Sequence, residues 1–280
     1  MRLALAFERP DNIELALEAL REPAFQVLAG GTDVFPALGQ GQLPCAFLDV
    51  TGIAGLGDIT RRNGATRIGA AATWTDIVKA KLPAAFDGLK VAAREVGSLQ
   101  IQNAGTLAGN LCNASPAADG VPPLLALGAR VEVASAARGT RVLAVSDFIQ
   151  GVRRTALAAD ELVTAIVVPD QPGGSRSAFE KLGSRRYLVI SICMTAANIL
   201  MDAQGRIAQA RVAVGACSAV AQRLPALEAD LIGRRLDDVT VHVDHLSPLS
   251  PIDDVRGSGA YRLDAVQEQC KRAIQRAGTV

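Results

Sequence analysis

The 280-residue sequence predicts a chain of the α+β class, built from two small α/β lobes and a C-terminal α+β unit. Up to about residue 168, short runs rich in β-branched residues alternate with amphipathic helical patterns, as expected for α/β lobes. A segment rich in Pro and Gly follows at 169–175, and beyond it lie longer strand patterns and one closing helix. We therefore predict three units, at residues 1–55, 56–172 and 173–280.

The composition indicates a compact, nearly neutral protein. Hydrophobic residues make up 49% of the chain, and 29 Lys and Arg oppose 28 Asp and Glu. This balance offers no positive surface to a polyanion, so nucleic-acid binding is not predicted. The longest strongly apolar stretch without a charge, Tyr187 to Met201, is shorter than the roughly 20 residues that span a bilayer. With no signal-peptide pattern at the N-terminus either, we expect a cytoplasmic protein that does not enter a membrane.

The first lobe is predicted to open with a strand and a helix. Asp11 can cap this helix, because its carboxylate can accept hydrogen bonds from the free N–H groups of the first turn. Ile13, Leu17 and Leu20 then recur on one helical face. The expected elements are, in order, a strand at 3–7, a helix at 12–20, a strand at 26–28, a short helix capped by Thr32 or Asp33, and a strand at 46–50.

The second lobe is expected to start after residues 55–57 and to combine helices with β-branched strands. Its predicted elements are a strand at 67–71, a helix opening at Thr73 or Thr75, a helix at 83–95, a long uncharged segment at 99–118, and strands at 130–135, 141–145 and 162–168. The C-terminal unit is predicted to contain strands at 178–183, 188–201 and 206–215, a hairpin turn at 202–205, and an amphipathic helix at 261–277.

The stretch VLAGGTDV at residues 27–34, which we call the first glycine loop, places two glycines between a strand and a helix. Such a turn presents backbone N–H groups that can bind a phosphate, and glycine lets the backbone approach the anion closely. Thr32 can add a hydroxyl donor. A Gly-Gly pair is also common in ordinary turns, so this loop alone does not decide between a turn and an anion site.

A second unusual stretch, residues 103–119, consists of small and hydrogen-bonding residues and carries no charge before its end. We call it the second glycine segment. Small residues allow a flat or extended ligand to lie against the backbone. The alternative is a tightly packed loop in which Asn110 and Asn113 bond to their own backbone. The residues alone leave both interpretations open.

Common catalytic motifs are missing from the sequence. The chain has no GxGxxG after a strand, no GxxxxGK[ST], no GxSxG and no HExxH. Its five cysteines are scattered and never form CxxC, which predicts reduced thiols. A nucleophile at Cys112 would need a histidine nearby, and both histidines lie late in the chain, in VHVDH at 241–245. We predict neither a catalytic residue nor a metal site.

Four segments, taken together and in this order, resemble a known family. They are AGGTD at 29–33, GTLAGNLCNASPAAD at 105–119, FEKLGSRR at 179–186 and SPIDDVRGS at 250–258. Over essentially its whole length the chain resembles the FAD-binding medium subunit of the molybdenum hydroxylases, a group that includes the flavoprotein subunits of xanthine dehydrogenase and carbon monoxide dehydrogenase. The resemblance implies a vanillyl-alcohol-oxidase-like (PCMH-type) FAD-binding domain of two α/β lobes, followed by the flavoprotein C-terminal domain.

The resemblance also implies which residues bind FAD. The first glycine loop would bind the diphosphate through its backbone amides, and residues 106–110 would form the opposite wall of that site. Asp119 would accept a hydrogen bond from a cofactor hydroxyl, Val163 would meet the flavin end through its backbone, and Lys181 near the isoalloxazine would favour reduced, anionic flavin. The implied cofactor-binding residues are Val27, Leu28, Ala29, Gly30, Gly31, Thr32, Asp33, Val34, Thr106, Leu107, Ala108, Gly109, Asn110, Asp119, Val163, Lys181 and Tyr187.

Two departures from the family pattern concern this site. The family usually reads GTIGGN, whereas this chain has Ala108 at the first glycine of the pair, so a positive φ there would require a reshaped loop. A position that is often aromatic at one flavin face is Val96 here. Tyr187 could cover the ring instead, or it could pack on the core.

By this resemblance the chain is an oxidoreductase subunit, the flavoprotein component of a molybdenum-dependent dehydrogenase or hydroxylase. FAD on this chain would take electrons from [2Fe-2S] clusters and pass them to NAD⁺ or another acceptor. The scattered cysteines cannot supply the Cys₄ sets of such clusters. The clusters are therefore expected on a small partner subunit and the molybdenum cofactor on a large one, in a heterotrimer or its dimer.

Two alternatives to this function remain open. The chain could be a free-standing FAD-dependent reductase of similar fold, which would need a substrate site and a general acid of its own. It could also be a non-catalytic assembly module that has lost FAD, and Ala108 is the feature that would favour this.

Overall fold

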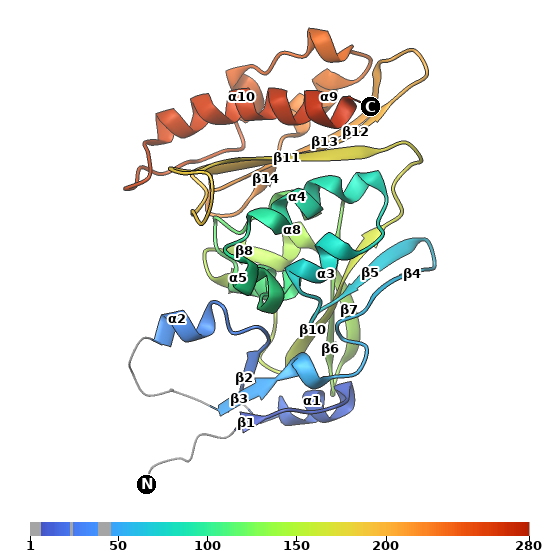
Figure 1. Cartoon of the computed structure of the whole chain (residues 1–280), viewed down its shortest axis with the longest axis vertical. Coiled ribbons are helices and arrows are strands. Elements are labelled where there is room, and N and C mark those ends of the chain that lie inside the picture. The colour runs from blue at the N-terminus through green and yellow to red at the C-terminus, as the bar shows by residue number, and fades with distance from the viewer. Residues whose placement is uncertain (1–6, 23–24, 39–45, 280) are drawn as a thin grey trace.

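The structure is a computed structural model that describes residues 7–22, 25–38 and 46–279. Three units follow one another along its long axis, with the first lobe at one end and the C-terminal unit at the other (Figure 1). Each contains its own sheet, and helices accompany all three sheets. The predicted class, two lobes followed by an α+β unit, is confirmed.

The first lobe is a parallel three-stranded sheet in which β3 lies between β1 and β2. Its elements are β1 (Phe7–Glu8), α1 (Ile13–Ala19), β2 (Phe25–Leu28), α2 (Val34–Leu38) and β3 (Ala46–Asp49). Asn12 caps α1 instead of the predicted Asp11, since its side-chain oxygen accepts the Leu15 N–H at 2.9 Å. Residues 3–6 of the predicted first strand lie outside the described residues.

The second lobe is built on an antiparallel sheet with the strand order β4-β5-β10-β6-β7. These strands are β4 (Ile59–Arg62), β5 (Ala65–Gly69), β6 (Arg130–Ser135), β7 (Gly139–Ala144) and β10 (Glu161–Pro169). The central place of β10 explains its nearly unbroken apolar sequence, because side chains on both of its faces are buried. The four strands predicted for this lobe are confirmed, and β4 is a further one.

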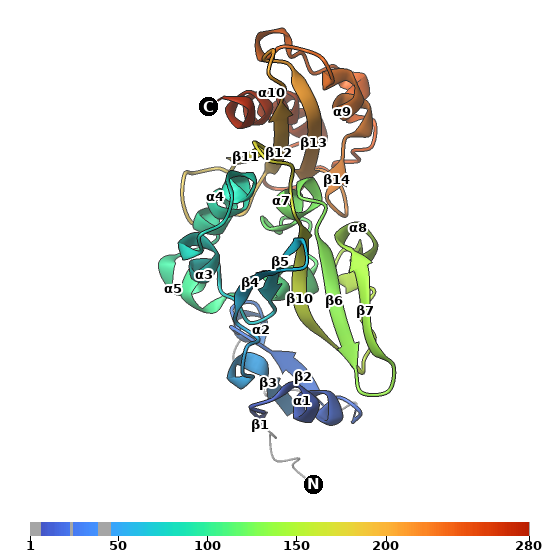
Figure 2. The same ribbon diagram turned by 90° about the vertical axis from the view of Figure 1, so that its right-hand side faces the viewer.

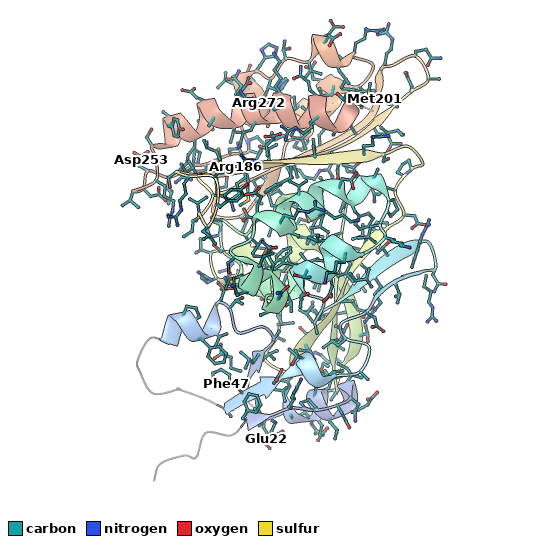
Figure 3. The ribbon with its side chains drawn as sticks, in the orientation of Figure 1. Glu22, Phe47, Arg186, Met201, Asp253 and Arg272 are labelled. Atoms are coloured by element: carbon teal, nitrogen blue, oxygen red, sulfur yellow. The ribbon has the colours of Figure 1, made fainter. Side chains whose placement is uncertain are left out.

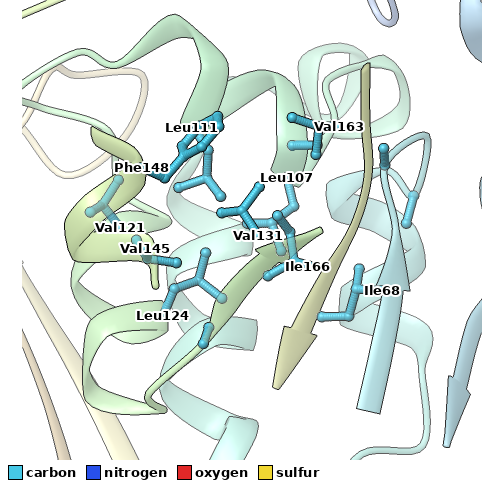
Figure 4. Close-up of a cluster of buried hydrophobic side chains, with 14 of the residues drawn as sticks. Ile68, Leu107, Leu111, Val121, Leu124, Val131, Val145, Phe148, Val163 and Ile166 are labelled. Atoms are coloured by element: carbon cyan, nitrogen blue, oxygen red, sulfur yellow. The ribbon is translucent and has the colours of Figure 1, made fainter. Parts of the chain in front are cut away.

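Short helices bury one face of this sheet. They are α3 (Trp74–Lys79), α4 (Asp87–Glu95), α5 (Leu99–Ala104), α6 (Leu107–Asn113), α7 (Val121–Ala126) and α8 (Val145–Phe148), and the hairpin of β8 (Ile149–Gly151) and β9 (Arg154–Thr155) follows them. Figure 4 shows Leu107 and Leu111 of α6 against Val131 and Ile166 of the sheet. Thr73 caps α3, one of the two positions predicted.

The uncharged segment at 99–118 contains two of these helices, α5 and α6. Each is capped by a hydroxyl: Ser98 accepts the Ile101 N–H, and Thr106 accepts the Gly109 N–H at 3.0 Å. The predicted helix at 83–95 starts as a 3₁₀ turn, Ala84–Phe86, and continues as α4. These turns bring the second glycine segment back toward the first lobe.

The C-terminal unit is an antiparallel sheet in the order β11-β12-β13-β14, with α10 on one face (Figure 2). Its elements are β11 (Arg176–Leu182), β12 (Cys193–Met201), β13 (Ile207–Gly215), β14 (Gln222–Arg223), α9 (Pro225–Leu231) and α10 (Gly259–Gly278). The strand predicted at 188–201 is shorter than expected, because Leu188 has φ +52°, outside the strand region. Residues 183–192 are therefore an irregular segment before β12.

The second lobe and the C-terminal unit share a packed interface. The face of the C-terminal sheet opposite α10 packs on α4 and α7, where Phe179 and Met194 contact Ala92 and Ala126 in one buried cluster (Figure 2). The Gly88 N–H also donates to Ser177 Oγ at 2.8 Å across the interface. Within the described residues, no helix combines the length and the apolar character needed to cross a bilayer.

Candidate cofactor site

A cavity of about 720 Å³ opens between the first lobe, the second lobe and the C-terminal unit. The first glycine loop lines one wall and the second glycine segment the opposite wall. Residues 96–98 contribute from the end of α4, and residues 188–190 contribute from the irregular segment of the C-terminal unit. The volume falls in the range of roughly 300–1,000 Å³ that is usual for sites of small molecules and cofactors.

The two glycine-containing walls touch each other at one end of the cavity. A Cβ atom on Gly30 would lie 1.9 Å from the Ala104 carbonyl oxygen, so only glycine permits this approach. A Cβ atom on Gly105 would lie 3.2 Å from Thr32 Oγ1. Gly31 has φ +67°, which turns the chain into α2. The sequence therefore needs its glycines here to bring the two walls together.

Several backbone N–H groups in these two walls have no protein partner. Within the described part of the chain, the N–H groups of residues 30–33 donate to no protein acceptor, and the same holds for those of Thr106 and Ala108. Buried or half-buried amides are nearly always hydrogen-bonded in folded proteins, by the protein, water or a ligand. A group of free N–H donors from two segments that lie this close suits an anion, and a diphosphate in particular.

Two asparagines of the second glycine segment are satisfied in different ways. Asn110 Oδ1 accepts the Gly120 N–H at 3.2 Å, a bond to the backbone ten residues further on and just beyond the segment. Asn113 instead reaches across the cavity wall, and its Nδ2 donates to Asp33 Oδ1 at 2.8 Å. Arg153 Nη1 donates to both oxygens of Asn113. Asn113 therefore links the first glycine loop to the turn between β8 and β9.

Asp119 is part of a buried ionic network at the other end of the second glycine segment. Its Oδ2 lies 2.7 Å from Lys181 Nζ, and Ser191 Oγ donates to its Oδ1 at 2.6 Å. Lys181 Nζ also donates to the Glu95 carbonyl oxygen at 3.2 Å. Burial raises the pKa of Asp119, and the neighbouring Lys181 and Ser191 act in the opposite direction. The network ties the C-terminal unit to the cavity wall.

Most of the sequence-predicted site residues lie together in the cavity wall. They are Val27, Ala29, Gly30, Gly31, Thr32, Asp33, Val34, Thr106, Ala108, Gly109, Asn110, Asp119 and Val163. Leu28 and Leu107 point into the hydrophobic interior instead, as Figure 4 shows for Leu107. Lys181 is not in the wall and lies behind Asp119.

Tyr187 does not lie over the cavity. Its side chain is 62% exposed, and the Arg186 guanidinium lies 5.3 Å from the centre of its ring. Arg186 belongs to the half of the C-terminal unit that also carries Asp253 (Figure 3). Leu188, Val189 and Ile190 line the cavity in its place. Their run of apolar residues is visible in the sequence, but their position depends on how residues 183–192 fold back.

Ala108 needs no reshaped loop. It lies in the first turn of α6 and is absent from the positive-φ residues of the described chain, so its side chain creates no backbone strain. Several further wall residues were not predicted from the sequence, among them Trp74 of α3 and Arg153. No sequence pattern marks Arg153, because it reaches the cavity through a turn at φ +56°.

Comparisons with known proteins match two consecutive parts of the chain. Residues 3–171 match the family described as the FAD binding domain in molybdopterin dehydrogenase, and residues 177–277 match the CO dehydrogenase flavoprotein C-terminal domain. The chain is 31% identical to the nicotine 6-hydroxylase medium subunit of Paenarthrobacter nicotinovorans, with 98% of each chain covered. It is also 31% identical to the nicotinate dehydrogenase FAD-subunit of Eubacterium barkeri, over 95% of this chain and 93% of that one.

A solved structure shares the whole fold. A chain of the reconstituted CO dehydrogenase from Oligotropha carboxidovorans superposes with a TM-score of 0.89 at 26% identity, and 99% of both chains is covered. The likeness therefore extends through both lobes and the C-terminal unit.

Proposed function

The chain belongs to the family of FAD-binding medium subunits of molybdenum hydroxylases, and from this membership we propose its place in an electron-transfer complex. In that complex it receives electrons from [2Fe-2S] clusters of a small partner subunit and delivers them to NAD⁺ or another acceptor. A large partner subunit holds the molybdenum cofactor and hydroxylates the substrate. Relatives named as a medium subunit and as an FAD-subunit support this division, since each is one component of a larger oxidoreductase.

The observation that carries the proposal is the group of unpartnered amides where the two glycine-containing walls meet. The N–H groups of residues 30–33 and of Thr106 and Ala108 would hold the FAD diphosphate. Thr32 Oγ1 lies beside Gly105 and can add a hydroxyl donor. Bound FAD supplies the redox chemistry, exchanging single electrons with the clusters and electron pairs with the acceptor.

The apolar part of the cavity would exclude water from the flavin. Val96 and Leu162 line it from the second lobe, and residues 188–190 line it from the C-terminal unit. Asp119 would accept a hydrogen bond from the cofactor in addition to the bonds it receives from Lys181 and Ser191, since a carboxylate offers about four lone-pair sites. The chain would thus orient the flavin without donating a catalytic acid or base of its own.

A pair of variants at Thr32 tests the diphosphate assignment. Thr32→Asp places a carboxylate among the unpartnered amides, and like charge against the diphosphate should cost of order a few kcal/mol, or about a hundredfold or more in affinity. Thr32→Val removes the hydroxyl at nearly constant volume and should cost tenfold at most. The dissociation constant of FAD can be followed through quenching of Trp74, the one tryptophan of the chain, which lines the cavity. Equal affinities of the two variants would reject the assignment.

The electron-transfer role is tested with the assembled complex. We expect near-stoichiometric, non-covalent FAD on this chain, and iron–sulfur and molybdenum polypeptides that co-purify with it. With substrate present, the flavin absorption of the complex should bleach, whereas the isolated chain should not respond. Turnover of a substrate by the isolated chain would instead favour a free-standing reductase. A folded chain that stays colourless after incubation with FAD would favour an assembly module.

A further inference from the structure

The cavity wall contains a single cationic side chain among the described residues that line it, that of Arg153. We propose that Arg153 provides the charged contact to the FAD diphosphate and thereby makes the site selective for ligands that carry phosphate. The inference rests on the proposed function, because it assumes that FAD occupies this cavity. It assigns a role to a residue that the sequence motifs of the site do not include.

The backbone holds Arg153 in a conformation that is uncommon for a residue with a side chain. It lies in the turn between β8 and β9 at φ +56°, and non-glycine residues rarely adopt positive φ without compensation from their surroundings. The compensation is visible here, because the Arg153 N–H donates to the carbonyl oxygen of Ala114 at 2.9 Å, just after α6. This bond fixes the turn against the second glycine segment.

The guanidinium is connected to the first glycine loop through one intervening residue. Arg153 Nη1 donates to the backbone oxygen of Asn113 at 3.2 Å and to its Oδ1, and Asn113 Nδ2 donates to Asp33 Oδ1 at 2.8 Å. Arg153 is therefore two hydrogen bonds from the loop whose amides are unpartnered. Arg153 and the residues that carry those amides line the same cavity.

Most of the hydrogen-bonding capacity of this guanidinium is unused. In the described chain no carboxylate lies within 4 Å of it, and its Nε and Nη2 groups donate to no acceptor. The other charged residues in the wall are acidic, Asp33 and Asp119, and Lys181 already offsets the second. A dianionic diphosphate thus meets one free cation here, and charge-assisted hydrogen bonds are about twice as strong as neutral ones.

Arg154 provides a matched control. It is the next residue, it carries the same charge and is exposed, but it does not line the cavity. Arg153→Gln and Arg154→Gln therefore change the net charge of the protein equally. We would measure the dissociation constant of FAD for the flavin-free full-length chain by Trp74 quenching. Displacement of FAD by ADP and by adenosine would then be measured for each variant.

We expect Arg153→Gln to lower the affinities for FAD and ADP by about tenfold or more at low salt. Arg154→Gln should change both affinities by less than about twofold. Adenosine, which has no phosphate, should bind both variants alike. In about 1 M NaCl the Debye length falls to about 3 Å, so charges are more strongly screened. The loss of affinity for FAD and ADP in Arg153→Gln should then be smaller. Arg153→Lys keeps the charge but lacks the planar guanidinium. Its affinities for FAD and ADP should therefore lie between those of Arg153→Gln and those of the unmodified chain.

Three outcomes would overturn the inference. If Arg153→Gln lowers the affinity for adenosine as much as the affinity for ADP, the side chain contacts the nucleoside. If Asn113→Ala, which keeps the guanidinium, reproduces the whole loss, Arg153 acts only as a brace for the wall. If Arg153→Gln binds FAD as the unmodified chain does, the contact does not exist. Failure of the unmodified chain to bind FAD would contradict the proposed function instead, so the two failures are distinguishable.

Discussion

Asp119 is the most constrained charged group in the cofactor cavity. Both of its oxygens accept hydrogen bonds from the C-terminal unit, one from Lys181 and one from Ser191. The side chains of Asp119 and Lys181 are 9% and 7% exposed, so neither charge is well solvated. Asp119 therefore largely balances the charge of Lys181. A neighbouring flavin would meet an ion pair and not an isolated cation.

Removing one partner of this pair should lower the free energy of unfolding more than removing the charges of both partners does. Lys181→Met leaves the Asp119 carboxylate buried without a counter-charge, and we expect the free energy of unfolding to fall by about 3–5 kcal/mol. Urea denaturation at neutral pH, followed by circular dichroism, measures the change.

The double variant Lys181→Met/Asp119→Asn supplies the control for this prediction. It removes both charges at little change in volume, so it should recover a large part of the loss, and the coupling between the two sites should exceed 1 kcal/mol, about the size expected of contacting residues. Additive losses from Lys181→Met and Asp119→Asn would show that the pair is not energetically coupled.

At the level of single elements, the edge of the second-lobe sheet depends on a buried carboxylate at the start of β10. Arg141 of β7 donates to both oxygens of Glu161 at 2.7 Å, and the Ala158 N–H donates to Oε2 at 2.8 Å. These bonds, that of Arg141 first, hold the pKa of Glu161 below its ordinary value of 4.5. Because the pKa is lower in the folded chain, the stability from Glu161 is present above pH 4.5 and is lost as pH falls through the folded pKa.

Glu161→Gln tests this acid-sensitive bond. We expect it to lower the free energy of unfolding at pH 7 by about 1–2 kcal/mol, since Arg141 is partly exposed and solvent weakens the pair. Below pH 4.5 the difference from the unmodified chain should shrink. Glu18→Gln, which removes a solvent-exposed carboxylate on α1, should have almost no effect at either pH. A constant difference at all pH values would contradict the assignment.

The sequence predicted strands better than helices, for reasons visible in particular elements. β6 and β10 combine β-branched residues with burial, and their predicted ranges nearly match the structure. α5 and α6 were not predicted, because their uncharged residues show no apolar stripe of helical period. Their hydroxyl caps, Ser98 and Thr106, are the local signal that a search for helix starts could have used.

The candidate site was predictable where it depends on short segments and not where it depends on the tertiary fold. The glycine residues of both walls stand out in the sequence because close approach of two backbones requires them. The contribution of residues 188–190 could not be predicted, because it requires the C-terminal unit to fold back on the second lobe. Arg153 was missed for a similar reason, since only the structure shows the turn that carries it to the cavity.

At the scale of the whole molecule, the three units form one continuous body around the cofactor cavity. The C-terminal sheet has its own core beneath α10, but its other face is covered by α4 and α7 of the second lobe. The cavity itself needs all three units for its walls. An interface of this kind leaves apolar surface on both sides when it opens, which favours joint unfolding of the units.

Ile274→Ala measures this coupling. Ile274 lies in the core between α10 and the C-terminal sheet, and its truncation should cost about 2–5 kcal/mol. Trp74, the one tryptophan, is buried in the second lobe, so its fluorescence reports on that lobe alone, whereas circular dichroism reports on the whole chain. If the units unfold together, the variant should lower the urea midpoint by the same amount with both signals, although Ile274 belongs to a different core from Trp74. A lower midpoint by circular dichroism with an unchanged Trp74 midpoint would mean that the C-terminal unit unfolds independently, and that the cavity can open without unfolding of the FAD-binding lobes.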